Sequence, residues 1–165
     1  MDEVLWRLFI DTKIAEYYYL EYAHRSSLYV LLLNALCLIA SFSGIGAWFT
    51  NNLPPLQSSL LILAAQILCA LQPLYPFSKR LYAANCIYGA YGDAALKAEQ
   101  LFNRLLYGSL DMKKLPAQVE ALQVEVASIE GKFSSASDFP QNMRFHKKAE
   151  SSTTQYLNTH FNMGG

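Results

Sequence analysis

Between residues 26 and 78 the sequence contains no Lys, Arg, Asp, Glu or His, although charged residues are frequent on both sides of this stretch. Over the whole chain, charged residues make up 16%, below the roughly 25% typical of soluble domains. A domain of 165 residues has too little protein to enclose two helices that are apolar on every face. The missing charge therefore favours a membrane segment over a buried hairpin in a soluble protein.

The sequence also lacks the motifs of catalysis and metal binding. Its three cysteines, Cys37, Cys69 and Cys86, have no C-x-x-C spacing, and its three histidines form no H-x-x-x-H or H-E-x-x-H pair. No nucleophile elbow, phosphate-binding loop or paired carboxylates are found. We therefore predict a protein that is not an enzyme and has no metal or cofactor, with cysteines that serve as small packing residues.

Two segments of the charge-free stretch are long enough to cross a bilayer. The hydrocarbon core is about 30 Å thick, so a spanning helix needs about 20 mostly apolar residues. Residues 28–49 and residues 56–77 both meet this length. The turn between them, TNNLPP, includes Pro54 and Pro55, which cannot continue a helix. The stretch 26–78 is thus predicted to be a two-helix transmembrane hairpin.

Positive charges next to the two spans predict the orientation of this hairpin. Lys13, His24 and Arg25 precede the first span, and Lys79 and Arg80 follow the second, whereas the turn has no positive charge. Cytoplasmic flanks are rich in Lys and Arg. Both termini of this multi-pass protein are therefore expected in the cytoplasm.

Polar residues recur on one face of each predicted span. Asn34 and Ser41 are seven residues apart in the first span, as are Ser59 and Gln66 in the second. Polar side chains at such depth face another helix or a water-filled cavity rather than lipid. Two interpretations stay open: hydrogen bonds within one hairpin, or a water-contacting pore face built from several copies of the chain.

Two prolines, Pro73 and Pro76, fall at the cytoplasmic end of the second span. Proline in a helix removes a hydrogen bond and produces a kink. This position predicts either a hinge between the membrane hairpin and the following helix or a static bend.

The N-terminal arm, residues 1–25, mixes apolar and charged residues without Gly or Pro and predicts a cytoplasmic or interfacial helix that runs into the first span. Its tyrosines, Tyr17, Tyr18, Tyr19 and Tyr22, have two interpretations. They suit the headgroup region of a membrane, where an apolar ring lies beside a wet hydroxyl. They equally suit packing against neighbouring helices.

Residues 79–133 carry two heptad seams, which predict a long cytoplasmic helical hairpin. The first seam lies in a predicted helix over residues 79–106 and consists of Leu81, Ala84, Tyr88, Tyr91, Ala95, Ala98, Phe102 and Leu105. The second seam consists of Leu115, Val119, Leu122, Val126, Ile129 and Phe133. The sequence does not decide whether these seams pair within one chain or between chains.

Residues 134–165 form a polar tail that is rich in Ser, Thr and Asn, and we predict that it is mobile or ordered only on a partner. Its basic cluster is Arg144, His146, Lys147 and Lys148. The chain as a whole has zero net charge, and four basic residues are fewer than the basic patch of a typical nucleic-acid-binding protein contains. The cluster is therefore interpreted as a solvated face, with contact to nucleic acid or anionic lipid as the alternative, and direct nucleic-acid binding is not expected.

The arrangement resembles the two-transmembrane SLATT-type effectors of bacterial anti-phage defence systems. The resemblance covers residues 11–106 and is carried by the N-terminal helix DTKIAEYYYLEYAHR, the two closely spaced spans, and the post-membrane helix KRLYAANCIYGAYGDAALKAEQLF. It implies a protein of the bacterial inner membrane that oligomerises and breaches the membrane when a separate sensor is activated. A sensor or inhibitor protein on the cytoplasmic side is then an expected partner, with the lipid bilayer and further copies of the chain.

We therefore predict an all-α, oligomeric membrane protein that permeabilises the membrane when triggered. One alternative is a non-conducting membrane anchor that recruits a cytoplasmic partner through its heptad helices. A third hypothesis is a phage holin, although the long patterned cytoplasmic region exceeds what a holin needs.

Overall fold

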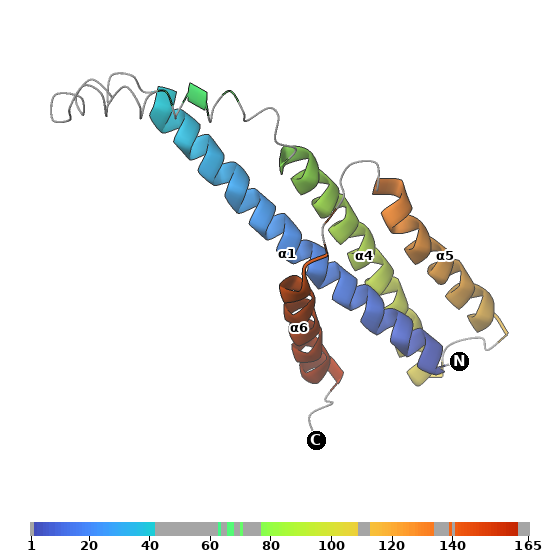
Figure 1. The fold of residues 1–165 in the computed structure, drawn as a ribbon. Helices are drawn as coiled ribbons and strands as arrows, with labels where there is room; N and C mark the ends of the chain where they lie inside the picture. The colour runs from blue at the N-terminus through green and yellow to red at the C-terminus, as the bar shows by residue number, and fades with distance from the viewer. Residues whose placement is uncertain are drawn as a thin grey trace. The chain divides into compact units, whose positions relative to one another are not determined.

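The computed structural model describes residues 2–41, 63, 66, 67, 70, 77–108, 113–133, 139 and 141–161 of the chain. The secondary-structure elements described there are all α-helices, so the predicted all-α class is confirmed (Figure 1). They are α1 (Asp2–Ser41), α4 (Phe77–Leu106), α5 (Leu115–Phe133) and α6 (Met143–Phe161).

The chain divides into two compact units. The first, which we call the bundle, contains Met1–His24 and Lys79–Gly165, and the second contains Arg25–Ser78. Helix α1 continues through the border between them, since it extends from Asp2 to Ser41. The second unit comprises nearly the same residues as the charge-free stretch 26–78.

Side-chain contacts within the bundle define the directions of its helices. Trp6 lies 4.8 Å from Phe102 and Tyr19 lies 5.7 Å from Tyr91 between ring centroids, so α1 and α4 are antiparallel. Lys97 pairs with Glu125, and the hydroxyl of Tyr91 reaches Glu130, so α4 and α5 are antiparallel as well. The seam helices thus form the predicted helical hairpin, and the N-terminal half of α1 completes a three-helix core.

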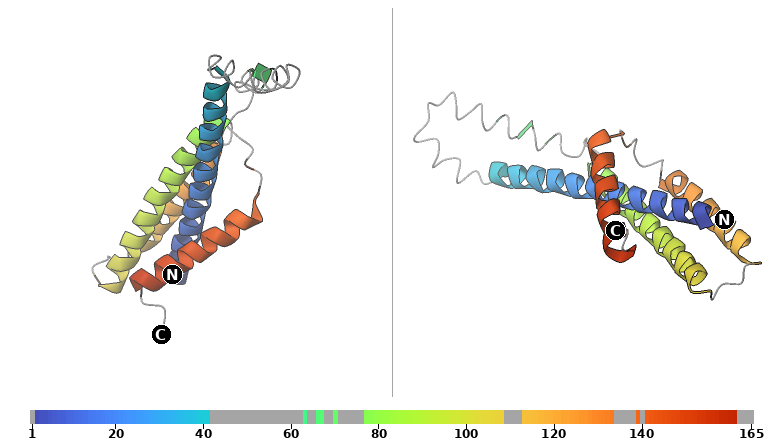
Figure 2. Two further views of the ribbon diagram at one scale, coloured as in Figure 1. Left: turned by 90° about the vertical axis from the view of Figure 1, so that its left-hand side faces the viewer. Right: turned by 90° about the horizontal axis from the view of Figure 1, so that it is seen from below.

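The fourth helix, α6, packs on α1 and α4 and crosses α1 obliquely, with its C-terminal end toward the N-terminus of α1 (Figure 2). Its C-terminal Phe161 contacts Trp6, whereas Phe145 near its start contacts Tyr18 and Tyr22. The expectation of a tail that is mobile or ordered only on a partner is wrong for residues 143–161. Burial of Phe145, Ala149 and Thr153 against the bundle orders this helix.

Local sequence signals explain where these helices begin and end. Gly108 has a φ of 64°, the left-handed conformation that terminates a helix, and its N–H bonds to the carbonyl of Leu105. Pro116 occupies the first turn of α5, where no intrahelical donor is needed. Asn142 caps α6, since its side-chain oxygen accepts a hydrogen bond from the N–H of Arg144.

Alanines allow the helices of the core to lie close together. Ala84, Ala94, Ala95 and Ala98 of α4 are each at most 1% exposed. Aromatic and branched side chains from α1 and α5 fill the space opposite, among them Phe9, Leu122 and Ile129. A smaller cluster at the end of the bundle joins Leu5 to Leu115 and Val119. Alternation of small and large residues thus produces the interdigitated packing of a protein interior.

Candidate functional site: an apolar helical stem and a bundle with polar clusters

Residues 28–38 of α1, which we call the stem, carry large apolar side chains that are open to the surroundings. Between 48% and 64% of the surface is exposed for Leu28, Tyr29, Leu31, Leu32, Leu36 and Leu38. At 100° per residue these positions are spread around half of the helix, and Val30, Leu33 and Cys37 occupy much of the rest. A helix that is apolar on nearly every side suits an apolar environment, either a protein core or a lipid bilayer.

The predicted spans lie only partly within the described residues. Among those residues, no helix combines the length and the hydropathy that a bilayer crossing requires. Residues 42–49 of the first predicted span and most of residues 56–77 lie outside the described part of the chain. The membrane hairpin therefore stays a prediction.

The residues of the predicted polar face are described unevenly. Asn34 is exposed on the stem, and Ser41 is the last residue of α1. Gln66 is helical and exposed, whereas Ser59 lies outside the described residues. The predicted hinge residues Pro73 and Pro76 lie outside them too.

The structure brings the two heptad seams together inside one chain. Tyr91 and Ala98 of the first seam share a core cluster with Leu122 and Ile129 of the second. Leu115 and Val119 pack with Phe102 and Leu105 in the neighbouring cluster. Leu81, Tyr88 and Val126 are half-buried. The two seams therefore pack against each other and against α1 within a single chain. The sequence alone does not decide between this pairing and pairing between chains.

A tyrosine–carboxylate cluster links the three core helices. The hydroxyl groups of Tyr19 and Tyr91 donate hydrogen bonds to Glu130 over 3.0 and 3.2 Å, and the two rings are stacked. Burial, the negative charge of Glu130 and the hydrogen bond to it raise the pKa of both tyrosines above 10.0. Both groups therefore stay neutral donors at physiological pH, and α1, α4 and α5 share one carboxylate.

A second polar cluster joins α1, α4 and α6. Lys13 forms a 2.9 Å ion pair with Glu16, and only 13% of either side chain is exposed. The Lys13 ammonium also lies 4.4 Å from the centre of the Tyr156 ring. The hydroxyl of Tyr156 donates a hydrogen bond to Glu99, and burial together with Glu99 raises the pKa of Tyr156 to about 12. This cluster fixes α6 to the core by polar contacts as well as apolar ones.

The N-terminal tyrosines thus serve in packing within the bundle. Tyr18 contacts Tyr22, and both contact Phe145 of α6. The hydroxyl of Tyr18 accepts a hydrogen bond from the backbone N–H of Asn142, the capping residue of α6. The packing interpretation of these residues therefore agrees with the structure.

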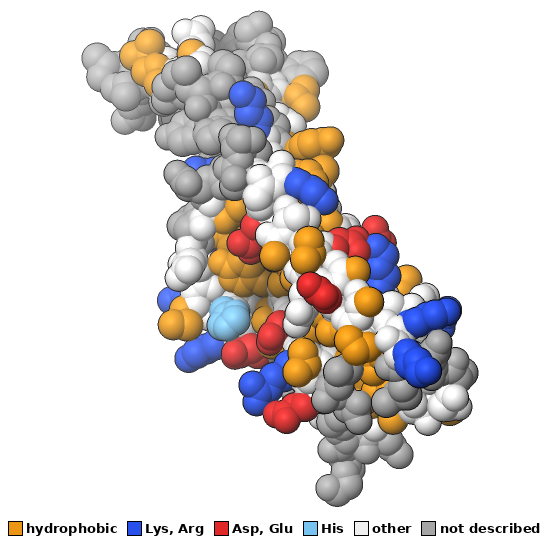
Figure 3. All heavy atoms as spheres, turned by 90° about the vertical axis from the view of Figure 1, so that its right-hand side faces the viewer, with side chains coloured by type: hydrophobic (Ala, Val, Ile, Leu, Met, Phe, Trp, Pro, Cys, Tyr) orange, Lys and Arg blue, Asp and Glu red, His pale blue; other side chains and the backbone are white. Residues whose placement is uncertain are grey.

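The basic cluster on α6 is divided among several partners. Lys148 pairs with Glu21 of α1, and His146 lies 3.5 Å from Glu150. Arg144 and Lys147 are exposed. On the face drawn in Figure 3, acidic and basic side chains are interspersed rather than gathered by sign. The interpretation of this cluster as a solvated face stays a prediction.

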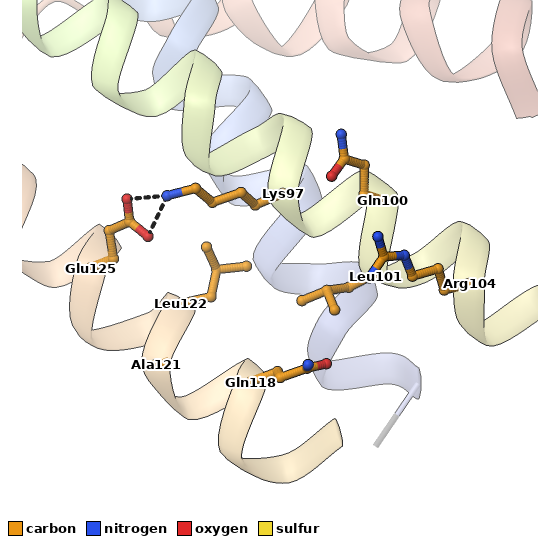
Figure 4. A pocket seen from close by; sticks show the side chains of 8 residues that line it. All are labelled: Lys97, Gln100, Leu101, Arg104, Gln118, Ala121, Leu122 and Glu125. Atoms are coloured by element: carbon orange, nitrogen blue, oxygen red, sulfur yellow. Dashed lines mark hydrogen bonds and ion pairs between the residues drawn. The ribbon is translucent and has the colours of Figure 1, made fainter. Parts of the chain in front are cut away.

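Two hollows open on the surface of the bundle. A groove of about 300 Å³ lies between α4 and α5, where Lys97 bridges to both carboxylate oxygens of Glu125 over 2.6 and 2.9 Å (Figure 4). A larger cavity of about 870 Å³ is lined by α1, by α6 and the preceding residues Phe139, Gln141 and Asn142, and by Glu130 of α5. Sequence reasoning missed this cavity because its walls come from residues up to 139 positions apart.

Within the described residues, no group of three or more His, Cys, Asp or Glu side chains is placed to hold a metal ion. A scan against protein-family models and searches of curated proteins and solved structures found no match to this chain. The resemblance to two-span effectors is therefore carried by the sequence features alone.

Proposed function

We propose that the chain is a membrane effector of anti-phage defence that oligomerises in the bacterial inner membrane and permeabilises it on a signal from a separate sensor. Residues 28–49 and 56–77 cross the bilayer in this proposal, and the bundle lies in the cytoplasm with both termini.

The exposed apolar surface of the stem is the observation that carries this proposal. Complete burial of a fully exposed large apolar side chain contributes about 1.5–3 kcal/mol, and a half-exposed side chain contributes a corresponding part of it. Leu28, Leu31, Leu32, Leu36 and Leu38 are all about half exposed or more. Such a surface is costly in water and favourable in lipid, and it continues into a sequence that stays uncharged to residue 78.

The packing of the bundle restricts how copies of the chain can associate. Its heptad seams are occupied by contacts within the chain, so they are not free to join copies unless the bundle opens. We therefore assign oligomerisation to the stem and the charge-free stretch. The surface of the bundle is left for the sensor or inhibitor protein.

Asn34 and Gln66 are the polar groups assigned to a water-contacting path. Both are exposed and lie in the unit of residues 25–78. Two helices cannot enclose water, so the path requires several copies of the chain. In that assembly, Asn34 and Gln66 face the path with Ser41 and Ser59.

Membrane potential in cells that overproduce the chain tests the proposal. A potential-sensitive dye should report depolarisation and growth should stop, whereas cells that overproduce the bundle residues without residues 26–78 should keep both. Normal potential and growth during overproduction, and also in the triggered system, would contradict the proposal.

The double variant Asn34→Leu/Gln66→Leu separates a pore from a non-conducting anchor. A pore should lose depolarisation while its oligomer survives in mild detergent, because only the polar path is removed. The matched control Asn85→Leu changes an exposed residue of α4 and should keep full activity. Full activity of the double variant would favour the anchor that recruits a cytoplasmic partner.

A further inference from the structure

The larger cavity of the bundle combines aromatic rings with negative charge. It has a volume of about 870 Å³, and the residues that matter for recognition are Tyr18, Tyr19, Phe139, Asp11, Glu130 and Glu150. Neither Lys nor Arg occurs among the described residues that line it. His146 is the remaining titratable nitrogen in the wall, and it lies 3.5 Å from Glu150.

We propose that this cavity binds a small organic cation of the alkylammonium class. Aromatic rings attract a cation through the negative charge of their faces, and carboxylates at the rim add attraction over a longer range. The methyl or methylene groups of an alkylammonium contact the rings favourably, whereas a hydrated metal ion has no apolar groups to do so. The proposal concerns the bundle alone and does not rest on membrane permeabilisation.

The same chemistry already holds an ammonium group elsewhere in the bundle. The Lys13 Nζ lies 4.4 Å from the centre of the Tyr156 ring and 2.9 Å from Glu16 Oε2. A tyrosine face and a carboxylate thus suffice to retain a cation on the same helix, α1. The cavity offers these two kinds of group with neither Lys nor Arg among the described residues of its wall.

One carboxylate of the cavity is fixed before any ligand arrives. Glu130 accepts hydrogen bonds from Tyr19 and Tyr91, and the two rings stack on each other with an interplanar angle of 11°. A group that is already held in position loses little freedom when a ligand binds. Asp11 and Glu150 lie at exposed positions and supply charge at the rim.

The site is open to water, so its affinity is expected to be modest. Cation–aromatic contacts at exposed sites and ion pairs at a surface are each weak, so a dissociation constant on the order of 1 mM is expected. Choline is a suitable probe, and 3,3-dimethylbutan-1-ol is its uncharged counterpart of the same shape.

Saturation-transfer difference NMR of the full chain in a maltoside detergent tests the proposal, because this detergent carries no ammonium group that could compete. Choline should bind roughly tenfold more tightly than 3,3-dimethylbutan-1-ol, since only choline is charged. Phosphocholine should bind about threefold more weakly than choline, because its phosphate is repelled by the carboxylates. Equal or tighter binding of phosphocholine would indicate a lipid headgroup rather than a free amine and would overturn the proposal as stated.

Neutral variants of the carboxylates locate the site. Glu130→Gln keeps an oxygen that accepts the tyrosine hydrogen bonds and should weaken choline binding about fivefold. Glu150→Gln, at an exposed rim position, should have an effect of the same sign with little influence on folding. The control Glu120→Gln lies on the exposed surface of α5 outside the cavity and should bind choline like the parent.

Circular dichroism of each variant verifies that the helices are intact. Binding of 3,3-dimethylbutan-1-ol as tight as that of choline would contradict the proposal. So would unchanged choline affinity in both Glu130→Gln and Glu150→Gln, or the absence of any choline signal at concentrations far above the expected constant.

Discussion

Tyrosine hydroxyl groups carry much of the polar contact between the helices of the bundle. Tyr19 and Tyr91 share Glu130, and Tyr156 reaches Glu99 from α6. The ring of each tyrosine buries apolar surface while its hydroxyl donates a hydrogen bond to a carboxylate. The run of tyrosines in α1 is therefore explained by packing against α4 and α6.

These tyrosines predict loss of stability at alkaline pH. Their folded-state pKa is raised above 10.0, to about 12 for Tyr22 and Tyr156. The unfolded chain therefore releases these protons first, and the stabilisation that is complete below pH 10.0 is lost as the pH rises toward about 12. Tyrosine absorbance at 295 nm and helical circular dichroism should then change together over this window.

The matched variant for this prediction is Tyr156→Phe. It removes one of the hydroxyl groups with a raised pKa, together with its hydrogen bond to Glu99. The remaining tyrosines should ionise over the same pH range as in the parent, with a smaller change in absorbance. Tyr107 is 85% exposed, so the helical signal of Tyr107→Phe should follow that of the parent at every pH. Tyrosine ionisation that is complete below pH 10 would contradict the buried hydrogen bonds.

At the scale of the helix, α4 has one crowded side and one open side. Ala98 is fully buried, so Ala98→Leu should cost about 1–3 kcal/mol through overpacking. A Cβ added at Gly89 meets no atom within 4 Å, so Gly89→Ala should raise stability by about 0.5–1 kcal/mol through helix propensity. Thermal unfolding of the two variants should thus shift in opposite directions. A lower midpoint of thermal unfolding for Gly89→Ala would contradict the conclusion that there is room for a Cβ at this position.

Helix α6 is held by few buried residues and should be the first described helix to open. Phe145→Ala removes a buried ring that contacts Tyr22 at 4.9 Å and should cost about 3 kcal/mol. Hydrogen exchange should then accelerate about a hundredfold in residues 143–161, while residues 115–133 stay protected. The control Gln155→Ala changes an exposed position of α6 and should leave exchange unchanged. Equal acceleration in α5 would show that α6 does not open separately.

Helix prediction succeeded where a periodic pattern was strong. The seam residues of α5 recur every three or four positions, and the structure has a helix over Leu115–Phe133. The stripe of α6 consists of Phe145, Ala149, Thr153 and Tyr156, in which polar and small residues replace the expected aliphatic ones. The Asn142 cap was its one clear local signal, because Asn is favoured just before a helix.

At the scale of the whole molecule, the two units suggest different surfaces for association. Copies of the chain are proposed to meet through the stem, so cysteine pairs should form there. Cys37 of the stem and Cys86 of α4 are both half-buried, which makes them a matched pair. In membranes, oxidation of a chain with Cys37 as its single cysteine should yield linked dimers.

The companion chain with Cys86 as its single cysteine should yield few dimers under the same oxidation. Its α4 is occupied by α1 and α5 within one chain. Gel electrophoresis without reductant measures both products. Dimers from Cys86 with none from Cys37 would show that copies pair through α4, contrary to the proposal.

The sequence by itself determined the all-α class, the position of the charge-free stretch and the two seams, because each depends on the spacing of residues along a single helix. Tertiary structure alone decided that the seams pair within the chain, that α6 packs on α1, and that Tyr18, Glu130 and Glu150 line one cavity. These contacts form between residues that are far apart in the chain. Heptad spacing indicates which face of a helix is apolar but not which other helix packs against that face.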